Sequence, residues 1–411
     1  MVAAWQARAW QTGCAAAFFY ICFFSVTAFQ LFNMTAWLGS KGIAAQTAGR
    51  LQGLSDLFFV VGVLLAGLLA DWKGFNRRLF LGFFALALMG YILLGVTAHP
   101  WGFGVALCLI SFAFLPLTNL TDTHLQPYIS RDLMPYARIR ALGSAAFAVV
   151  ILTLAFMGEG AILAAFYPAI LAFLILTGIS LIFLPAHPVH TPAPLSHKFT
   201  TFTKLLRQPK FLLFYLTVAV IFGSHGAHYI YAVPIWRDWG FSSGMIYGVL
   251  GWGVIVEILF FVFAPKALTE QRAVPLLTIC ALAAVVRWVA WPFVDGWVGL
   301  LLVHGLHVFT FALTHLTSLA FLRRRVCETQ LGAAQALLPA ISIGVGMATA
   351  KFLAAQFYDQ GAALTFFIMA GFAAIAFPLL LSLYFLLGKR PTSQETAVLG
   401  ESALPRGKAP L

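Results

Sequence analysis

The chain has 411 residues, enough for two or three soluble domains, but its composition excludes that organisation. Hydrophobic residues make up 61% of it and charged residues 9%, whereas a soluble globular chain carries roughly 25% charged residues. The net charge of +12 does not indicate nucleic-acid binding, because Lys and Arg fall in short clusters between apolar runs and form no continuous basic face. We therefore expect a multi-pass membrane protein whose surroundings are the lipid bilayer.

Apolar stretches of about 20 residues predict membrane-spanning helices, because only helices and closed barrels satisfy every backbone group in lipid. Nothing in the chain alternates like a barrel strand, so the predicted fold is all-α. The expected spans are twelve: about 14–38, 45–70, 79–98, 101–125, 141–158, 161–185, 211–236, 244–263, 273–294, 297–322, 332–356 and 362–387. They divide the chain into a six-helix half at 1–185, a central loop at 186–210, a second six-helix half at 211–388 and a polar tail, expected to be disordered, at 389–411.

The distribution of basic residues predicts the orientation. Most of the 25 Lys and Arg residues lie on one side: in the central loop, at both ends of the chain and in clusters such as Arg323-Arg324-Arg325. The other side carries Lys41, Arg50 and Arg237. The positive-inside rule places both termini and the central loop in the cytoplasm of a bacterial-type inner membrane.

The loop between the second and third spans carries a recognisable motif, Gly67-x-x-x-Asp71 followed by Gly74, Arg77 and Arg78. It resembles the signature of the major facilitator superfamily, although Trp72 stands where a basic residue is usual. Such a motif implies a tight cytoplasmic gate in which the Asp pairs with a basic residue or a helix end. Twelve spans in two halves are also typical of secondary transporters built from repeats.

Further segments resemble the phenylpropionate permease group, which belongs to the same branch as lactose permease and the nucleoside–proton symporters, or resemble that branch as a whole. They are Ser224 to Tyr231, Gly253 to Glu257, Arg287-Trp288, Leu306 to His315, Pro116 to Asp122, and Tyr136 to Gly143. One departure is His228, where that group tends to carry a tyrosine, and Asp56 and Lys351 have no counterpart. The resemblance covers most of both halves and implies transport of a small organic solute.

Three carboxylates lie within predicted spans: Asp56, Asp122 and Glu257. Each costs about 2.5–3.5 kcal/mol at the bilayer centre, so each is expected to face the protein interior with a partner. Glu257 stands in an otherwise apolar stretch, which favours a role in carrying the coupled proton. Arg287 is the natural counter-charge, either for Glu257 or for a substrate carboxylate. The helix rise places Arg287 and Glu257 roughly 10 Å apart in depth, which is long for a direct pair.

Histidines cluster in two spans. In a regular helix, His304, His307 and His315 share one face, which suits a proton relay beside Glu257. His225 and His228 lie among glycines that permit a bend, and Tyr229 and Phe311 could stack on a ring-bearing substrate. Packing and interfacial anchoring explain these aromatic residues equally well. A metal site is not expected, because neither the histidines nor the five cysteines show ligand spacing.

Three more charged residues have two readings each. By resemblance, Asp122 and Arg140 bind substrate, although they could equally form a cytoplasmic gate. Lys351 offers an anionic substrate a second positive contact or extends towards the membrane surface. Asp56 and Asp122 are the expected binders if the substrate is neutral.

The favoured function is proton-coupled symport of a small organic solute by alternating access, with an aromatic carboxylate as leading substrate. The alternative within transport is a neutral nucleoside or sugar. A membrane-embedded transferase is a third reading, but it needs paired Asp motifs that the chain lacks. We expect no enzymatic activity, no cofactor beyond the coupled proton, and a monomer.

Overall fold

The computed structural model describes residues 2–73, 77–129, 133–184, 195–263, 273–294 and 296–388. These residues form helices and turns, and none of them lies in a strand. Twelve of the helical segments they contain are long and apolar enough to cross a membrane, which confirms the predicted all-α fold with twelve spans. The predicted tail at 389–411 lies outside the described residues.

The first six spans contain seven helices, because the fourth span is divided at Phe114 and Leu115. The helices are α1 (Val2–Ser40), α2 (Ala45–Lys73), α3 (Arg77–Val96), α4 (Pro100–Ala113), α5 (Pro116–Ile129), α6 (Tyr136–Leu154) and α7 (Glu159–Ile182). We call this part the N-half.

The last six spans, which we call the C-half, are more often interrupted. Their elements are α9 (Pro209–Gly223), α10 (Gly226–Asp238), α11 (Ser243–Phe263), α13 (Ala273–Ala290), η1 (Trp291–Phe293), α14 (Trp297–Gly305), η2 (Val308–Leu313), α15 (Thr314–Arg325), α16 (Glu328–Pro339), η3 (Ala340–Met347), α17 (Ala348–Phe357), η4 (Tyr358–Gln360), α18 (Ala362–Ala374) and α19 (Ala376–Gly388). Two of them, η2 and η3, are π-helices. The segment predicted as a central loop contains a helix as well, α8 (Leu195–Leu206).

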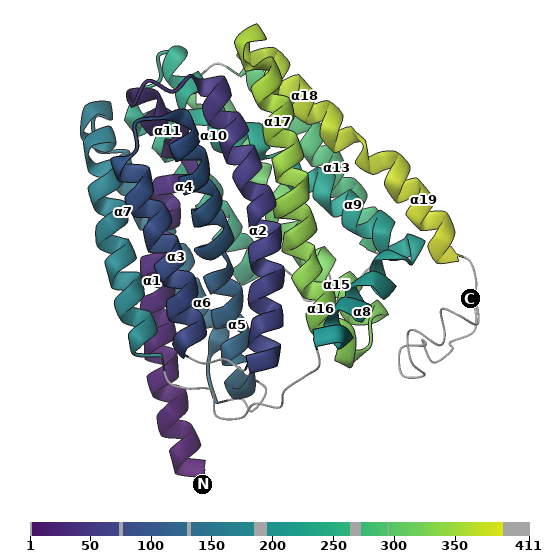
Figure 1. Ribbon diagram of the computed structural model, residues 1–411. Coiled ribbons are helices and arrows are strands. Elements are labelled where there is room, and N and C mark those ends of the chain that lie inside the picture. The colour runs from purple at the N-terminus through teal and green to yellow at the C-terminus, as the bar shows by residue number, and fades with distance from the viewer. Residues whose placement is uncertain are drawn as a thin grey trace.

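The start of α1 and the end of α19 point to the same end of the bundle, which we call the terminal end (Figure 1). The opposite end, the far end, carries the short turns after α1, α10, α13 and α17. Gly296 and Gly361 lie in two of these turns with φ of 81° and 117°, a backbone conformation that favours glycine. Short turns of this kind join each helix to an antiparallel neighbour.

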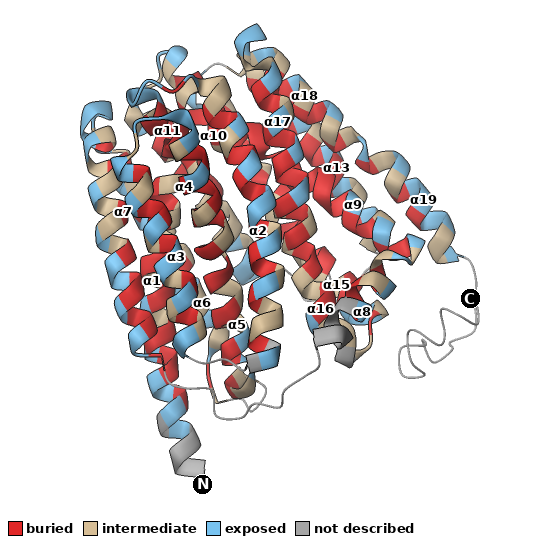
Figure 2. Ribbon diagram, in the orientation of Figure 1, coloured by how far each residue is buried: buried red, intermediate tan, exposed pale blue. Residues whose placement is uncertain are grey.

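Exposed residues follow the outer faces of the helices and buried residues lie between the helices (Figure 2), and many of the exposed residues are large and apolar. Val96, Phe156 and Val262 are among many large apolar residues that are exposed. An exposed apolar surface on this scale is compatible with lipid and not with water.

The apolar core shows where the two halves meet. One cluster extends from α1–α7 into α10, α11 and α17, so it is shared by both halves. A second cluster lies within the C-half and includes Phe202 and Leu205 of α8. Polar contacts reinforce the shared region at the far end: Tyr231 donates to the carbonyl of Ala45 at 3.1 Å, and Arg50 donates to Gln356 at 3.0 Å. The halves are therefore packed together at the far end.

Candidate functional site

Arg287 is the centre of the polar site, and its side chain is completely buried in α13. Its guanidinium donates from Nη1 to His307 Nδ1 and to Thr310 Oγ1, both at 3.1 Å, and from Nη2 to His304 Nδ1 at 3.2 Å. The ring of Trp288 lies 4.4 Å from the guanidinium carbon. All of these contacts come from neutral groups, and among the described residues no carboxylate forms an ion pair with Arg287.

His307 connects Arg287 to Glu257. Its Nε2 lies 3.5 Å from Glu257 Oε2, while its Nδ1 faces Arg287. The sequence predicted a gap too long for a direct pair, and in the structure the histidine occupies that gap. Arg140 of the N-half and His315 also act electrostatically on the Glu257 carboxyl. Groups from both halves therefore surround Glu257.

The tenth span is not the regular helix assumed in the sequence prediction, because the π-helix η2, which contains more residues per turn, lies between His307 and His315. That assumption is wrong, and the three histidines have different partners. His304 contacts Arg287, His307 contacts both Arg287 and Glu257, and His315 interacts electrostatically with Glu257.

The seventh span breaks where its glycines allow a bend. α9 ends at Gly223 and α10 begins at Gly226, so His225 lies in the break. Its Nδ1 contacts the carbonyl of Phe222 at 3.0 Å, and its Nε2 contacts Thr310 Oγ1 at 2.9 Å. Thr310 thus joins His225 to the Arg287 network.

His228 lies in aromatic surroundings. Its ring is stacked on Trp291 with centroids 6.1 Å apart, lies 5.1 Å from His304 and meets the edge of Phe32 at 5.7 Å. Phe32 belongs to α1, so this contact joins the halves. His228 is buried, and its role as a substrate contact stays a prediction.

Two of the predicted aromatic residues border the charged groups. Tyr229 packs between Phe32 at 5.7 Å and His225 at 5.8 Å, and it is close enough to Glu257 and Arg287 to respond to their charges. Phe311 stacks on His307 with centroids 5.2 Å apart. Both rings are therefore in place to contact an aromatic group bound next to Arg287.

Asp122 and Arg140 lie together in the N-half, but two tyrosines mediate their association. Tyr20 and Tyr136 donate hydrogen bonds to Asp122 Oδ1 at 2.5 and 2.9 Å. The Arg140 guanidinium lies 5.2 Å from the Tyr20 ring and 4.4 Å from the Phe24 ring. This arrangement fixes the Asp122 carboxylate, and it agrees with either of the two predicted roles.

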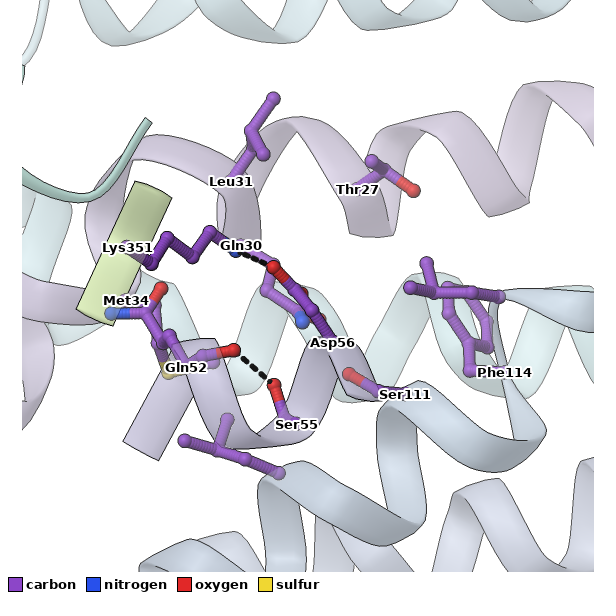
Figure 3. Close-up of a pocket in the computed structure, with 12 residues that line it drawn as sticks. Thr27, Gln30, Leu31, Met34, Gln52, Ser55, Asp56, Ser111, Phe114 and Lys351 are labelled. Atoms are coloured by element: carbon purple, nitrogen blue, oxygen red, sulfur yellow. Dashed lines mark hydrogen bonds and ion pairs between the residues drawn. The ribbon is translucent and has the colours of Figure 1, made fainter. Parts of the chain in front are cut away.

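Asp56 and Lys351 form an ion pair, with Lys351 Nζ 2.8 Å from Asp56 Oδ2 (Figure 3). The expectation that Lys351 could extend towards the membrane surface is wrong, because its side chain is turned inward and buried. The pair borders a cavity of about 80 Å³. The lining of this cavity comes mainly from α1, α2 and α4, together with Lys351.

The predicted gate motif lies partly outside the described residues. Gly67 is within α2, and Arg77 and Arg78 open α3 with exposed side chains. The side chain of Asp71 and the whole of Gly74 are not described, so their pairing stays a prediction. Among the residues that the structure does describe, no group of three or more His, Cys, Asp or Glu side chains could hold a metal ion.

Three contacts of the site were missed in the sequence. Thr310 lies inside a segment that resembles the family, but its hydroxyl was not among the predicted contacts of the site. Tyr136 opens another such segment, but its hydroxyl was not a predicted contact either. Tyr20 carried no signal, because tyrosine is also common in apolar helices as a packing residue. Only the packing of α1 and α6 against α5 places both hydroxyls on Asp122.

The fold and the buried polar site are those of a secondary transporter. Residues 14–369 match the model of the MFS_1 like family, and the chain belongs to this family of the major facilitator superfamily. It is 28% identical over 366 residues to the "Probable 3-phenylpropionic acid transporter" of Escherichia coli strain K12, covering 86% of this chain and 92% of that one. The resemblance predicted from the motifs is thereby confirmed.

Solved structures show the same fold at lower identity. A mutant form of the nucleoside transporter NupG superposes with a TM-score of 0.76 at 15% identity, covering 91% of this chain and 100% of that one. A D-xylose–proton symporter gives 0.65 at 14% identity, with 94% and 99% covered. These similarities confirm the major facilitator fold, and the protein is a transporter and not an enzyme.

Proposed function

We propose that the protein is a proton-coupled symporter of a small aromatic carboxylate. The 28% identical relative, whose name gives 3-phenylpropionic acid as its substrate, supports this class of substrate. We further propose that the protein works as a monomer in a bacterial inner membrane with both termini in the cytoplasm. The proton is the coupling ion, and no other cofactor takes part.

One observation carries the proposal: Arg287 is a buried cation whose described partners are all neutral. An unpaired buried charge costs several kcal/mol, because it has lost its water without gaining a counter-charge. A substrate carboxylate supplies that counter-charge and matches the planar guanidinium with two parallel hydrogen bonds. Arg287 Nε, which is buried without a partner, is a further donor for it.

Charge balance then links the substrate to a proton. Without substrate, the charges of Arg287 and Glu257 add up to zero, although His307 separates the two groups and they form no ion pair. A bound monoanion leaves one excess negative charge, which a proton on Glu257 removes. Because a net charge is costly in the membrane interior, the loaded carrier reorients most easily when it holds both proton and substrate. One proton is therefore carried with each monoanion.

Aromatic side chains near Arg287 provide contacts for the ring of the substrate. Tyr229 and Phe311 both border the Arg287–His307–Glu257 row, and Phe32 reaches Tyr229 from the N-half. Offset or edge-on contact with an aromatic ring contributes about 0.5–1.5 kcal/mol per pair beyond area burial. A contact shared by both halves also suits a substrate that is bound between them.

The substitution Glu257→Gln tests the proposal. Glutamine mimics the protonated acid but cannot release a proton, so the variant should bind substrate and exchange it across the membrane. It should not accumulate substrate against a gradient, because the empty carrier must lose its proton to return. The measurement is counterflow beside proton-driven uptake of radiolabelled 3-phenylpropionate in the same proteoliposomes.

Asp359→Asn is the matched control, because it removes an exposed carboxylate at the far end and should leave both activities unchanged. If the Glu257→Gln variant accumulated substrate normally, another group would have to carry the coupled proton, such as a histidine of the tenth span or Asp122. Uptake of a neutral nucleoside or sugar in place of the acid would contradict the proposed substrate class.

A further inference from the structure

A second charged site lies in the interface between the halves, apart from the Arg287 network. Asp56 belongs to α2 of the N-half and Lys351 to α17 of the C-half, so their ion pair, which we call the cross-half pair, joins the two halves. Each side chain is 9% exposed. Neither residue takes part in the coupling mechanism proposed above.

Small residues bring the two helices together around this pair. A Cβ on Gly53 would lie 3.3 Å from the carbonyl oxygen of Ala348, and a Cβ on Gly344 would lie 2.2 Å from a methyl of Val60. Gly53 precedes Asp56 by three residues, so both lie on the face of α2 that meets α17. Figure 1 shows α2 and α17 side by side. The contact is close and depends on the halves staying in their present positions.

The cavity beside the pair is polar enough to hold water. Its lining includes the hydroxyls of Thr27, Ser55 and Ser111 and the amides of Gln30 and Gln52 (Figure 3). Its volume of about 80 Å³ exceeds what a single water molecule needs, and the lining offers the two to four polar partners that a buried water requires. Asp56 lines the same cavity, so water held there lies next to its side chain.

The surroundings of Asp56 identify Lys351 as its charged partner. The ammonium of Lys351, from α17, is the charged group that acts on the Asp56 carboxylate. α1 presents Gln30, whose Oε1 accepts from the titratable hydroxyl of Tyr91 at 2.5 Å. α2 itself adds Gln52, whose amide donates to a threonine at 2.8 Å, and α4 adds the neutral Ser111.

Alternating access requires the halves to separate at the far end, and the cross-half pair opposes that movement. Pulling two buried opposite charges apart leaves both without a partner, at a cost of several kcal/mol. A proton on Asp56 removes the attraction before the helices move. Lys351 then keeps a single charge, which water entering between the opening halves can solvate.

We propose that Asp56 is a proton-binding site distinct from Glu257, and that a proton taken from the cavity water onto Asp56 releases Lys351 and allows the halves to open at the far end. The inference rests on the proposed alternating-access function. It does not depend on which substrate is carried.

Opening can be measured directly with two spin labels. Ser40, at the end of α1, and Gln360, in η4, are exposed on opposite halves at the far end. In a background without the five native cysteines, labels at these positions report the distance between the halves by pulsed electron resonance. The measurement is made without substrate from about pH 8 to about pH 5, a range in which a buried carboxyl can titrate.

In the otherwise unaltered protein, the ratio of long to short distances should rise as the pH falls, by up to about tenfold per pH unit for one coupled proton. The double variant Asp56→Asn/Lys351→Met removes both charges and should give a ratio that does not depend on pH. Asp56→Lys/Lys351→Asp restores a pair with a carboxyl at the same cavity, and its ratio should depend on pH again.

Several results would overturn the inference: a ratio independent of pH in the unaltered protein, a pH-dependent ratio in the neutral double variant, or a pH-independent ratio in the exchanged pair. Should the neutral variant fail to fold, Asp56→Thr/Lys351→Leu removes the same charges. Glu257→Gln in the same background separates this inference from the coupling proposal. It should keep the pH-dependent opening, and loss of that dependence would assign the opening proton to Glu257 instead.

Discussion

Every nitrogen of an arginine is a donor, and this property fixes the chemistry of its neighbours in the site. Because His304 and His307 each present Nδ1 to Arg287, both Nδ1 atoms must accept, which leaves the proton of each neutral ring on Nε2. His307 then donates from Nε2 towards the Glu257 carboxylate. A change at Arg287 is therefore transmitted to Glu257 through one imidazole.

The substitution Arg287→Gln should separate carboxylate binding from other roles. Loss of a buried charged partner costs about 3–5 kcal/mol, so transport of the acid should fall by more than about a hundredfold. Uptake of the neutral amide of the same acid should fall by only a few-fold, since it has no charge to pair. Competition assays in proteoliposomes with both compounds measure the two effects.

Arg323→Gln is the control for that experiment, because Arg323 is exposed at the end of α15 and its loss should affect neither compound. An equal loss of acid and amide transport in the Arg287→Gln variant would indicate a structural or proton-coupling role for the arginine.

Among the helices, the interrupted ones belong mostly to the C-half and border the site. The π-helix η2 carries Thr310 and Phe311, and the π-helix η3 precedes α17 with Lys351. A π-helix has more residues per turn than an α-helix. Each π segment therefore changes the direction in which the side chains after it point. The interruptions thus decide which side chains of one span face Arg287.

The close crossing of α2 and α4 leads to a prediction about stability. A Cβ on Gly62 of α2 would lie 1.9 Å from the carbonyl oxygen of Phe112 in α4, so an alanine there forces the two helices apart. Gly62→Ala should reduce the free energy of unfolding by about 1–3 kcal/mol, as overpacking does. A Cβ on Gly82 of α3 would meet no neighbouring atom within 4 Å, so Gly82→Ala is the matched control.

Thermal unfolding in detergent should show a lower melting temperature for Gly62→Ala and an unchanged or higher one for Gly82→Ala, because alanine favours a helix over glycine by about 1 kcal/mol. Equal melting temperatures for the two variants would contradict the close crossing of α2 and α4.

The two ends of the membrane bundle differ in charge. The start of α1, the end of α19 and the α8–α9 junction lie at the terminal end. Basic clusters such as Arg323 to Arg325, at the end of α15, lie there too. The positive-inside rule makes this end cytoplasmic. A reporter fused after Arg207 should therefore be active only if it is an enzyme that works in the cytoplasm. A fusion after Gly240, in the far-end turn that follows α10, should be active only outside the cytoplasm. Activity of the Arg207 fusion outside the cytoplasm would contradict the proposed orientation.

The number of spans and a small set of candidate residues follow from the amino-acid sequence alone. Twelve apolar stretches predict twelve helices because lipid accepts no other open backbone structure. Charge is costly in that environment, so Asp56, Asp122, Glu257, Arg287 and Lys351 were conspicuous from composition alone. The motifs around Arg287 and Glu257 also predicted the family, which the match over residues 14–369 confirms.

How these residues are paired follows from the packing of the helices. Asp56 and Lys351 lie in different halves of the chain, and their contact follows from the close packing of α2 on η3 at Gly344 and on α17 at Gly53. The position of His307 between Arg287 and Glu257 depends on the packing of the tenth span against α13 and α11. The physical reason is that lipid and protein interior are equally apolar, so hydrophobicity does not specify which face of a membrane helix turns inward. Close packing and the pairing of a few polar groups make that choice.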